Sequence, residues 1–134
     1  MKRAFIYVIL GILSGVCFLF LLEQWAYHNR VGNHLPTLAD QRITHSGWAL
    51  TGDMYEIYGK VASVQEFHVK GWQQIVIENP ELSEFTPVLS HYCETYRAAD
   101  KSSLDFFEKE TGNHTLRAVV NRQTGETYIL IFGR

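Results

Sequence analysis

The 134-residue sequence has only two cysteines, Cys17 and Cys93, and they do not form a disulfide framework. Cys17 lies in a long apolar run near the N-terminus, whereas Cys93 lies in the part of the chain expected to fold as a domain. One thiol would therefore lie in lipid and the other in folded protein. Two explanations of Cys93 remain open: a small buried side chain, or a disulfide between two copies of the chain.

Motifs for catalysis, metal binding or phosphate binding are also lacking. His91 and Cys93 are two residues apart, a spacing that points them in different directions on a helix, and no His-x-x-x-His pair occurs. Glu78, Glu81 and Glu84 form an acidic group, but their spacing is not that of a calcium-binding loop. Nucleophile elbows and glycine-rich phosphate loops are absent. We therefore predict no catalytic residue, no metal site and no cofactor.

An excess of basic residues is missing as well. The chain has 12 Lys and Arg against 14 Asp and Glu, and beyond position 23 the balance is 10 basic against 13 acidic residues. Nucleic-acid binding needs a clustered basic face, and a membrane-surface patch needs a run of Lys and Arg. The composition thus argues against both kinds of partner for the domain.

What the sequence does contain is an uncharged apolar run over residues 4–22. A helix of this length spans roughly 28 Å, close to the hydrocarbon thickness of a bilayer. A cleaved signal peptide has a shorter apolar region of about 7–15 residues and small residues at the cleavage site, which are missing around Glu23. We therefore predict an uncleaved signal-anchor transmembrane helix within residues 1–23.

The flanking charges predict the orientation of this helix. Lys2 and Arg3 precede the apolar run, whereas Glu23 follows it and the next basic residue is Arg30. The positive-inside rule places the N-terminus in the cytoplasm and the domain on the other side, in the periplasm of a bacterium. Trp25 would then lie at the outer headgroup level, where amphipathic rings are favoured.

Gly11 and Gly15 are four residues apart on one face of the predicted membrane helix. Small residues at this spacing allow two helix backbones to approach closely, which indicates a homodimer through this face. Glycine is also common in membrane helices without any such role. The two explanations stay open.

The rest of the chain predicts a juxtamembrane linker at residues 24–36 and one α+β domain at residues 37–134, with an antiparallel sheet and two or three helices. Weak helical spacing predicts a helix over residues 37–46. Residues 53–68 are β-prone but start with the helix-capping pattern Asp53-x-x-Glu56, so strand and helix both remain open. We favour strands there, with a bulge or bend at Gly59.

Two helices and one strand are predicted in the middle of the domain. A β-branched run between turn signals predicts a strand over residues 72–78. Thr86-Pro87 is typical of a helix start, and an apolar stripe follows it: Leu89, Tyr92, Cys93 and Tyr96. A second short helix is predicted from Ser102 to Gly112.

The C-terminus predicts a β-hairpin, with strands over residues 114–121 and 127–132 and a turn that ends at Gly125. The last strand is apolar on both faces, so we expect it to be central in its sheet or covered on both sides. Phe107 and Ile129 are predicted to be buried core side chains.

These observations favour a non-enzymatic, membrane-anchored protein-interaction domain of the cell envelope, such as an accessory, assembly or immunity-type factor. Its contacts would be lipid through residues 4–22 and a protein partner. The alternative is an extracytoplasmic small-ligand binding module, which a pocket lined by Trp72, Tyr92 and Tyr96 would favour. A bare strand edge would favour the interaction domain. An enzyme using Cys93 or the acidic group is a third hypothesis.

Overall fold

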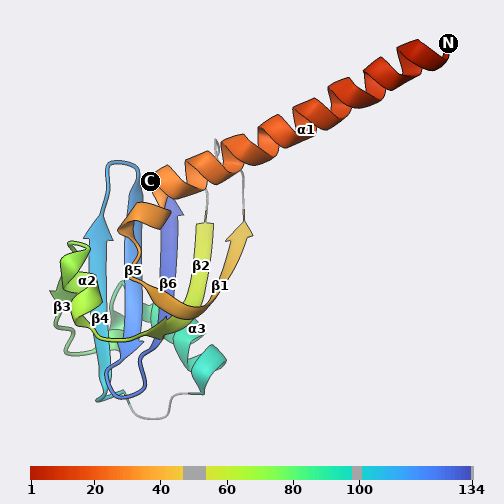
Figure 1. The fold of residues 1–134 in the computed structure, drawn as a ribbon. Helices are drawn as coiled ribbons and strands as arrows, with labels where there is room; N and C mark the ends of the chain where they lie inside the picture. The colour runs from red at the N-terminus through yellow and green to blue at the C-terminus, as the bar shows by residue number, and fades with distance from the viewer. Residues whose placement is uncertain (47–53, 98–100, 134) are drawn as a thin grey trace. The chain divides into compact units, whose positions relative to one another are not determined.

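The computed structural model describes residues 1–46, 54–97 and 101–133 and divides the chain into two units, Met1–Asn33 and His34–Arg134. Asp53, the first residue of the predicted helix-capping pattern, lies outside these residues. Each unit is described by itself, and Figure 1 identifies their elements by label.

The first unit consists mainly of the helix α1, Lys2–Arg30, followed by the start of the short 3-10 helix η1, Gly32–His34. Its large apolar side chains between Phe5 and Leu22 are exposed, as expected for a helix that meets lipid. The helix is long and apolar enough to cross a membrane, as the sequence predicts. It also continues to Arg30, so the first half of the segment assigned to a linker is helical.

The second unit contains a six-stranded sheet with two short helices and one longer helix. The strands are β1 Leu38–Ser46, β2 Met54–Val61, β3 Gln73–Ile75, β4 Leu104–Glu110, β5 His114–Asn121 and β6 Glu126–Gly133. The helices are α2 Gln65–Val69, the 3-10 helix η2 Pro80–Leu82, and α3 Thr86–Tyr96. The content agrees with the α+β class that the sequence predicts.

All neighbouring strands are antiparallel, in the order β1-β2-β6-β5-β4-β3. The predicted C-terminal hairpin is confirmed as β5 and β6, joined by a turn that ends at Gly125. The strand β6 lies between β2 and β5, which confirms its predicted central position. A strand paired on both edges and covered on both faces explains why Tyr128, Ile129 and Ile131 are all fully buried.

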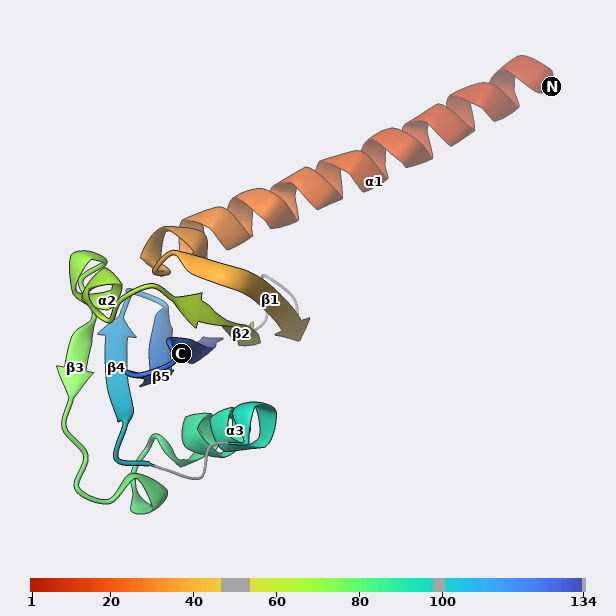
Figure 2. The ribbon, with the colours of Figure 1, turned by 60° about the horizontal axis from the view of Figure 1, so that its bottom comes forward.

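Helices cover both faces of the sheet. Figures 1 and 2 show α3 on one face of the strands and α2 on the other. On the α3 face, Leu89 and Tyr92 pack in one cluster with Phe106 and Leu130. Phe107, the neighbour of Phe106 along β4, lies in the core of the opposite face and stacks on Phe67 of α2 at 4.6 Å between ring centroids.

The prediction of a helix over residues 37–46 is wrong, because this segment is the strand β1. Its pairing with β2 passes from Ala39 opposite Lys60 directly to Arg42 opposite Tyr58. Two residues, Asp40 and Gln41, therefore face the single Gly59, which is a β-bulge. The bulge breaks the period-two pattern, and this is why the sequence spacing looks helical. The expected bulge near Gly59 exists, but its extra residue lies in the facing strand.

The prediction of a second short helix over residues 102–112 is also wrong, since this segment is the strand β4. Leu104, Phe106 and Phe107 are all buried because β4 is covered on both faces. A doubly covered strand does not alternate apolar and polar residues, so periodicity does not separate it from a short helix.

The remaining predictions are confirmed in part. Residues 54–61 form a strand, but a helix, α2, follows it at Gln65–Val69. The strand predicted over residues 72–78 exists only as the three residues of β3. The helix predicted from Thr86 is α3, with proline in its first turn. Its stripe is buried at Leu89 and Tyr92 and half-buried at Cys93 and Tyr96.

Candidate functional site

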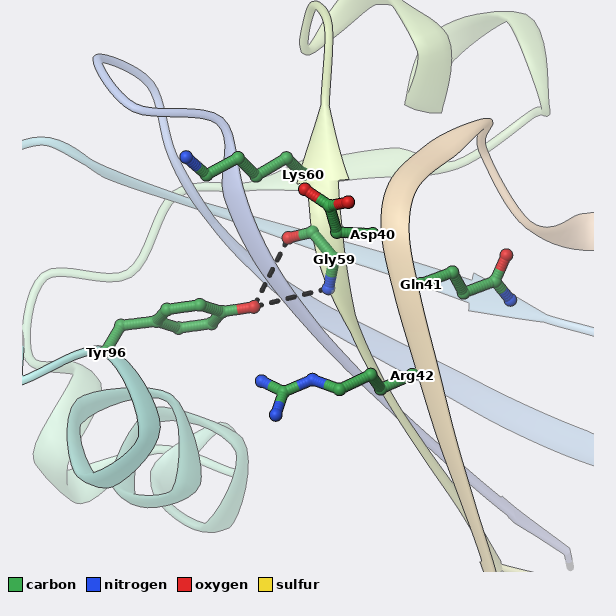
Figure 3. A pocket seen from close by; sticks show the side chains of 6 residues that line it. All are labelled: Asp40, Gln41, Arg42, Gly59, Lys60 and Tyr96. Atoms are coloured by element: carbon green, nitrogen blue, oxygen red, sulfur yellow. Dashed lines mark hydrogen bonds between the residues drawn. The ribbon is translucent and has the colours of Figure 1, made fainter.

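Near the C-terminal end of α3, the Tyr96 hydroxyl contacts the backbone of the sheet. Tyr96 Oη accepts a hydrogen bond from the Gly59 backbone N–H at 3.2 Å, and it lies 3.0 Å from the Thr127 carbonyl oxygen and 3.3 Å from that of Gly59. Figure 3 shows the two contacts with Gly59. Because Gly59 lies opposite the bulge, the hydroxyl bonds β2 where its regular pairing with β1 is interrupted.

A depression of about 450 Å³ opens beside this contact. Its lining residues come from β1, β2 and α3: Asp40, Gln41, Arg42, Gly59, Lys60 and Tyr96. Arg42 and Tyr96 reach toward the same space from opposite sides, one from the strand and one from the helix (Figure 3). The bulge creates this arrangement, because it gives β1 two successive residues that do not pair with β2.

The depression has two cations, Arg42 and Lys60, and the acidic Glu126 of β6 lies opposite Lys60 in the neighbouring strand. In the described residues, neither Arg42 nor Lys60 forms an ion pair with a carboxylate. Arg42 lies over the Tyr58 ring, with its guanidinium carbon 5.7 Å from the ring centroid. Burial raises the pKa of Tyr96 above its ordinary value, while the hydrogen bond from Gly59 and the charge of Arg42 oppose that rise.

We expect Tyr96→Phe to lower the free energy of unfolding by about 1–2 kcal/mol, because it leaves the Gly59 N–H without its hydroxyl partner. Urea unfolding of the detergent-solubilised chain measures this change. Tyr7→Phe, at an exposed position of α1, is the control and should leave the midpoint unchanged. An unchanged midpoint for Tyr96→Phe would show that the hydroxyl does not hold α3 on the sheet.

A second polar cluster lies on the same face of the sheet, around Glu56. The Tyr128 hydroxyl donates a hydrogen bond to Glu56 Oε1 at 2.9 Å, and His91 Nδ1 lies 3.8 Å from the same oxygen. The His91 and Tyr128 rings stack at 5.8 Å. Burial, followed by the contact with Glu56, raises the pKa of Tyr128, so this phenol stays protonated as a donor.

The aromatic pocket named for the ligand hypothesis does not form. Trp72 lies on the α2 face, where it packs against Phe67 and donates a hydrogen bond from Nε1 to the His34 carbonyl at 2.6 Å. Tyr92 is buried on the α3 face, and Tyr96 borders the depression. The sheet therefore separates Trp72 from the two tyrosines.

The other candidate groups are dispersed. In the acidic group, Glu81 pairs with Lys101 and Glu84 pairs with Arg117, so these two carboxylates have separate partners. Cys93 is half-buried in the α3 cluster, and burial raises the pKa of its thiol, which lowers its reactivity. Within residues 1–46, 54–97 and 101–133, no three His, Cys, Asp or Glu side chains are grouped to hold a metal ion.

Comparison with protein-family models, curated proteins and solved structures finds no match to this chain. The functional argument therefore rests on the chain's own residues. Sequence reasoning did not bring Arg42, Lys60 and Tyr96 together, because it assigned β1 to a helix. Gly59 inside a β-prone run was the available signal for the bulge, since glycine inside a strand often marks one. The residues that face it, Asp40 and Gln41, are known only from the pairing of β1 with β2.

Proposed function

We propose that this chain is a membrane-anchored, non-enzymatic protein-interaction domain of the cell envelope, of the accessory, assembly or immunity type. The observation that supports this best is the position of β1, which ends the sheet with nine residues. No strand in the described part of the chain pairs with its outer edge. An extended segment of a partner can add to such an edge through main-chain hydrogen bonds.

The two edges of the sheet differ, and the difference favours β1 as the docking edge. The opposite edge strand, β3, has only three residues, and a short edge gives another chain little to pair with. In β1 the side chains of residues 39–44 are all exposed, among them Ile43, whose neighbour across the pair is the buried Ile57. The exposed apolar side chain beside free backbone groups is suited to a partner strand.

Photo-crosslinking tests this proposal directly. A benzophenone side chain at Thr44, on the outer strand, should give a discrete crosslinked protein in membranes of the cells that make the chain. The same probe at Gln123, exposed in the β5–β6 turn, should not. If Thr44 gives no product while the protein is folded and present, the proposal that β1 is the docking edge is wrong.

The proposal includes α1 as an uncleaved anchor with the N-terminus in the cytoplasm, supported by Lys2 and Arg3 before the apolar run. A reporter that is active only outside the cytoplasm, fused after Arg134, should therefore be active. The full-length protein should also remain in the membrane after carbonate extraction. A soluble, shortened product would identify the segment as a cleaved signal peptide instead.

A second candidate function is an extracytoplasmic small-ligand binding module. The depression between β1 and α3 favours it, because about 450 Å³ falls in the range of small-molecule sites. In that case the Thr44 probe should give no crosslinked protein, and Tyr96→Phe should change ligand affinity.

The proposal also includes a homodimer through Gly11 and Gly15 of α1. An added Cβ at either glycine meets no heavy atom within 4 Å, and small residues at this spacing allow two helix backbones to approach closely.

A further inference from the structure

The depression beside Tyr96 lies on the side of β1 that faces β2 and α3. Asp40 and Arg42 project from β1 toward the side on which Tyr96 lies, whereas Gln41 between them points away (Figure 3). A carboxylate and a guanidinium of the same strand therefore border one recess. A ligand held there would leave the outer edge of β1 open to a partner.

The charges around this recess are balanced in sign. Arg42 and Lys60 are the cations of its lining, and Asp40 is the anion. Glu126 of β6 lies opposite Lys60 in the neighbouring strand and adds a second negative charge. Two positive and two negative groups thus surround the recess, so a ligand with charge of a single sign gains little from them.

The opposite charges of β1 do not neutralise each other. In the part of the chain that the structure describes, the Asp40 carboxylate forms no hydrogen bond or ion pair. Arg42 lies over the Tyr58 ring at 5.7 Å, which limits the positions of its guanidinium. Other charged side chains of the domain are also unpaired, but here an anion and a cation share the wall of one depression. A ligand that carries both charges is able to bind the two at once.

Asp40 also has an unusual backbone conformation, with a φ of +52°. Arg97 is the other non-glycine residue of the described chain with a positive φ, and it directly follows α3, where this conformation is common. Asp40 lies inside a strand, where the same conformation costs free energy. Strain of this kind often occurs at ligand-binding positions, because the surrounding structure must hold the side chain in place.

We infer that this recess binds a small zwitterion of the α-amino acid class, with Arg42 as the ligand of its carboxylate and Asp40 as the ligand of its ammonium group. The inference rests on the second candidate function and deepens it, since it names the chemistry of the small ligand. A guanidinium binds a carboxylate through two parallel hydrogen bonds, and an ammonium group has three donors for a carboxylate. The Tyr96 ring faces the same space, and the contacts of its hydroxyl with Gly59 and Thr127 fix this wall before a ligand arrives.

The experiment uses the full chain in dodecyl maltoside, an uncharged detergent, because phosphatidylcholine headgroups are themselves zwitterions. Isotope-labelled glycine gives a nuclear magnetic resonance signal for the Gly59 N–H, which lies in the recess and bonds Tyr96. The probes are the standard L-amino acids, each titrated alone at constant pH and ionic strength. Each amino acid that shifts the signal is compared with its N-acetyl form, which lacks the cation, and with its carboxamide, which lacks the anion.

We expect at least one amino acid to shift the Gly59 signal. Its N-acetyl and carboxamide forms should each bind about five- to tenfold more weakly, because one charge-assisted contact is lost. Arg42→Gln should weaken the amino acid to the same degree and leave the carboxamide no further loss. Asp40→Asn should do the same for the N-acetyl form, and asparagine tolerates the backbone conformation of Asp40. Glu78→Gln and Lys101→Gln change charges outside the recess and are the matched controls.

The other outcomes overturn the inference and separate it from the second candidate function. If the N-acetyl and carboxamide forms bind as tightly as the amino acid, or if Asp40→Asn and Arg42→Gln change nothing, the recess binds small molecules but not as a zwitterion site. The same holds if neutral monosaccharides shift the Gly59 signal and no amino acid does. Tighter binding of glycerophosphoethanolamine than of any amino acid would assign the recess to lipid headgroups. If none of these probes shifts the signal, the inference and the small-ligand function both fail.

Discussion

Replacing Phe107 by alanine is expected to lower the free energy of unfolding by about 3–5 kcal/mol, the range for deleting a large aromatic side chain from a packed core. Phe107 has no exposed surface, stacks on Phe67 and also contacts the His68 ring edge-on. Its removal leaves a cavity under α2, and the five-residue helix has little other packing with which to close it. Most of the stability of a domain this small would be lost.

Urea unfolding, followed by tryptophan fluorescence, measures this change. Trp72 packs edge-on against Phe67 at 5.2 Å and therefore reports on the same face of the sheet. Val76→Ala is the control, because Val76 is 92% exposed and its truncation should alter the midpoint little. A cost below about 1 kcal/mol for Phe107→Ala would mean that α2 does not cover this face in solution.

Replacing Gly125 by alanine should produce the second large loss of stability. Gly125 has a φ of +75°, a conformation that costs other residues about 1–3 kcal/mol. A Cβ at this position would also lie 2.4 Å from the Val61 carbonyl oxygen, which is too close for any real contact. The Gly125 carbonyl accepts a hydrogen bond from the Val61 N–H at 2.9 Å, so the glycine also joins the end of β2 to the β5–β6 turn.

Gly112→Ala is the matched control for this substitution. Gly112 lies in the short connection between β4 and β5, and an added Cβ there meets nothing within 4 Å. Both variants add the same methyl group, but only Gly125→Ala adds it at a positive φ and against the Val61 backbone. Gly125→Ala should shift the urea midpoint strongly and Gly112→Ala hardly at all. Equal midpoints would contradict the tight approach of Gly125 to Val61.

Local sequence was sufficient for the elements whose pattern agrees with a simple period. The uncharged run of residues 4–22 predicts α1 because a membrane helix needs only length and apolarity. The hairpin of β5 and β6 follows from Gly125, whose positive φ favours glycine, and from the apolar residues of its two strands. These residues alternate with other residues in β5 and are continuous in β6. Thr86-Pro87 marks the start of α3, because proline suits the first helical turn.

The errors occurred where contacts distant in sequence decide the conformation. β1 has a bulge opposite Gly59, and β4 is buried on both faces between α2 and α3, which both precede it in the chain. Neither feature leaves a period-two pattern, so the segments resemble short helices until their partner strands are known. The length of β3 also depends on its single neighbour β4, since an edge strand ends where its pairing ends.

The sequence by itself determined that the chain has one apolar helix long enough for a bilayer, followed by a small α+β unit, because composition and length govern those features. Only the tertiary structure decided which residues form the site. Arg42, Lys60 and Tyr96 lie on three elements far apart in the chain, and they meet because β1 pairs with β2 and α3 packs on the same face. Pairing register is a long-range property, and a shift of one residue would have turned Arg42 to the opposite face.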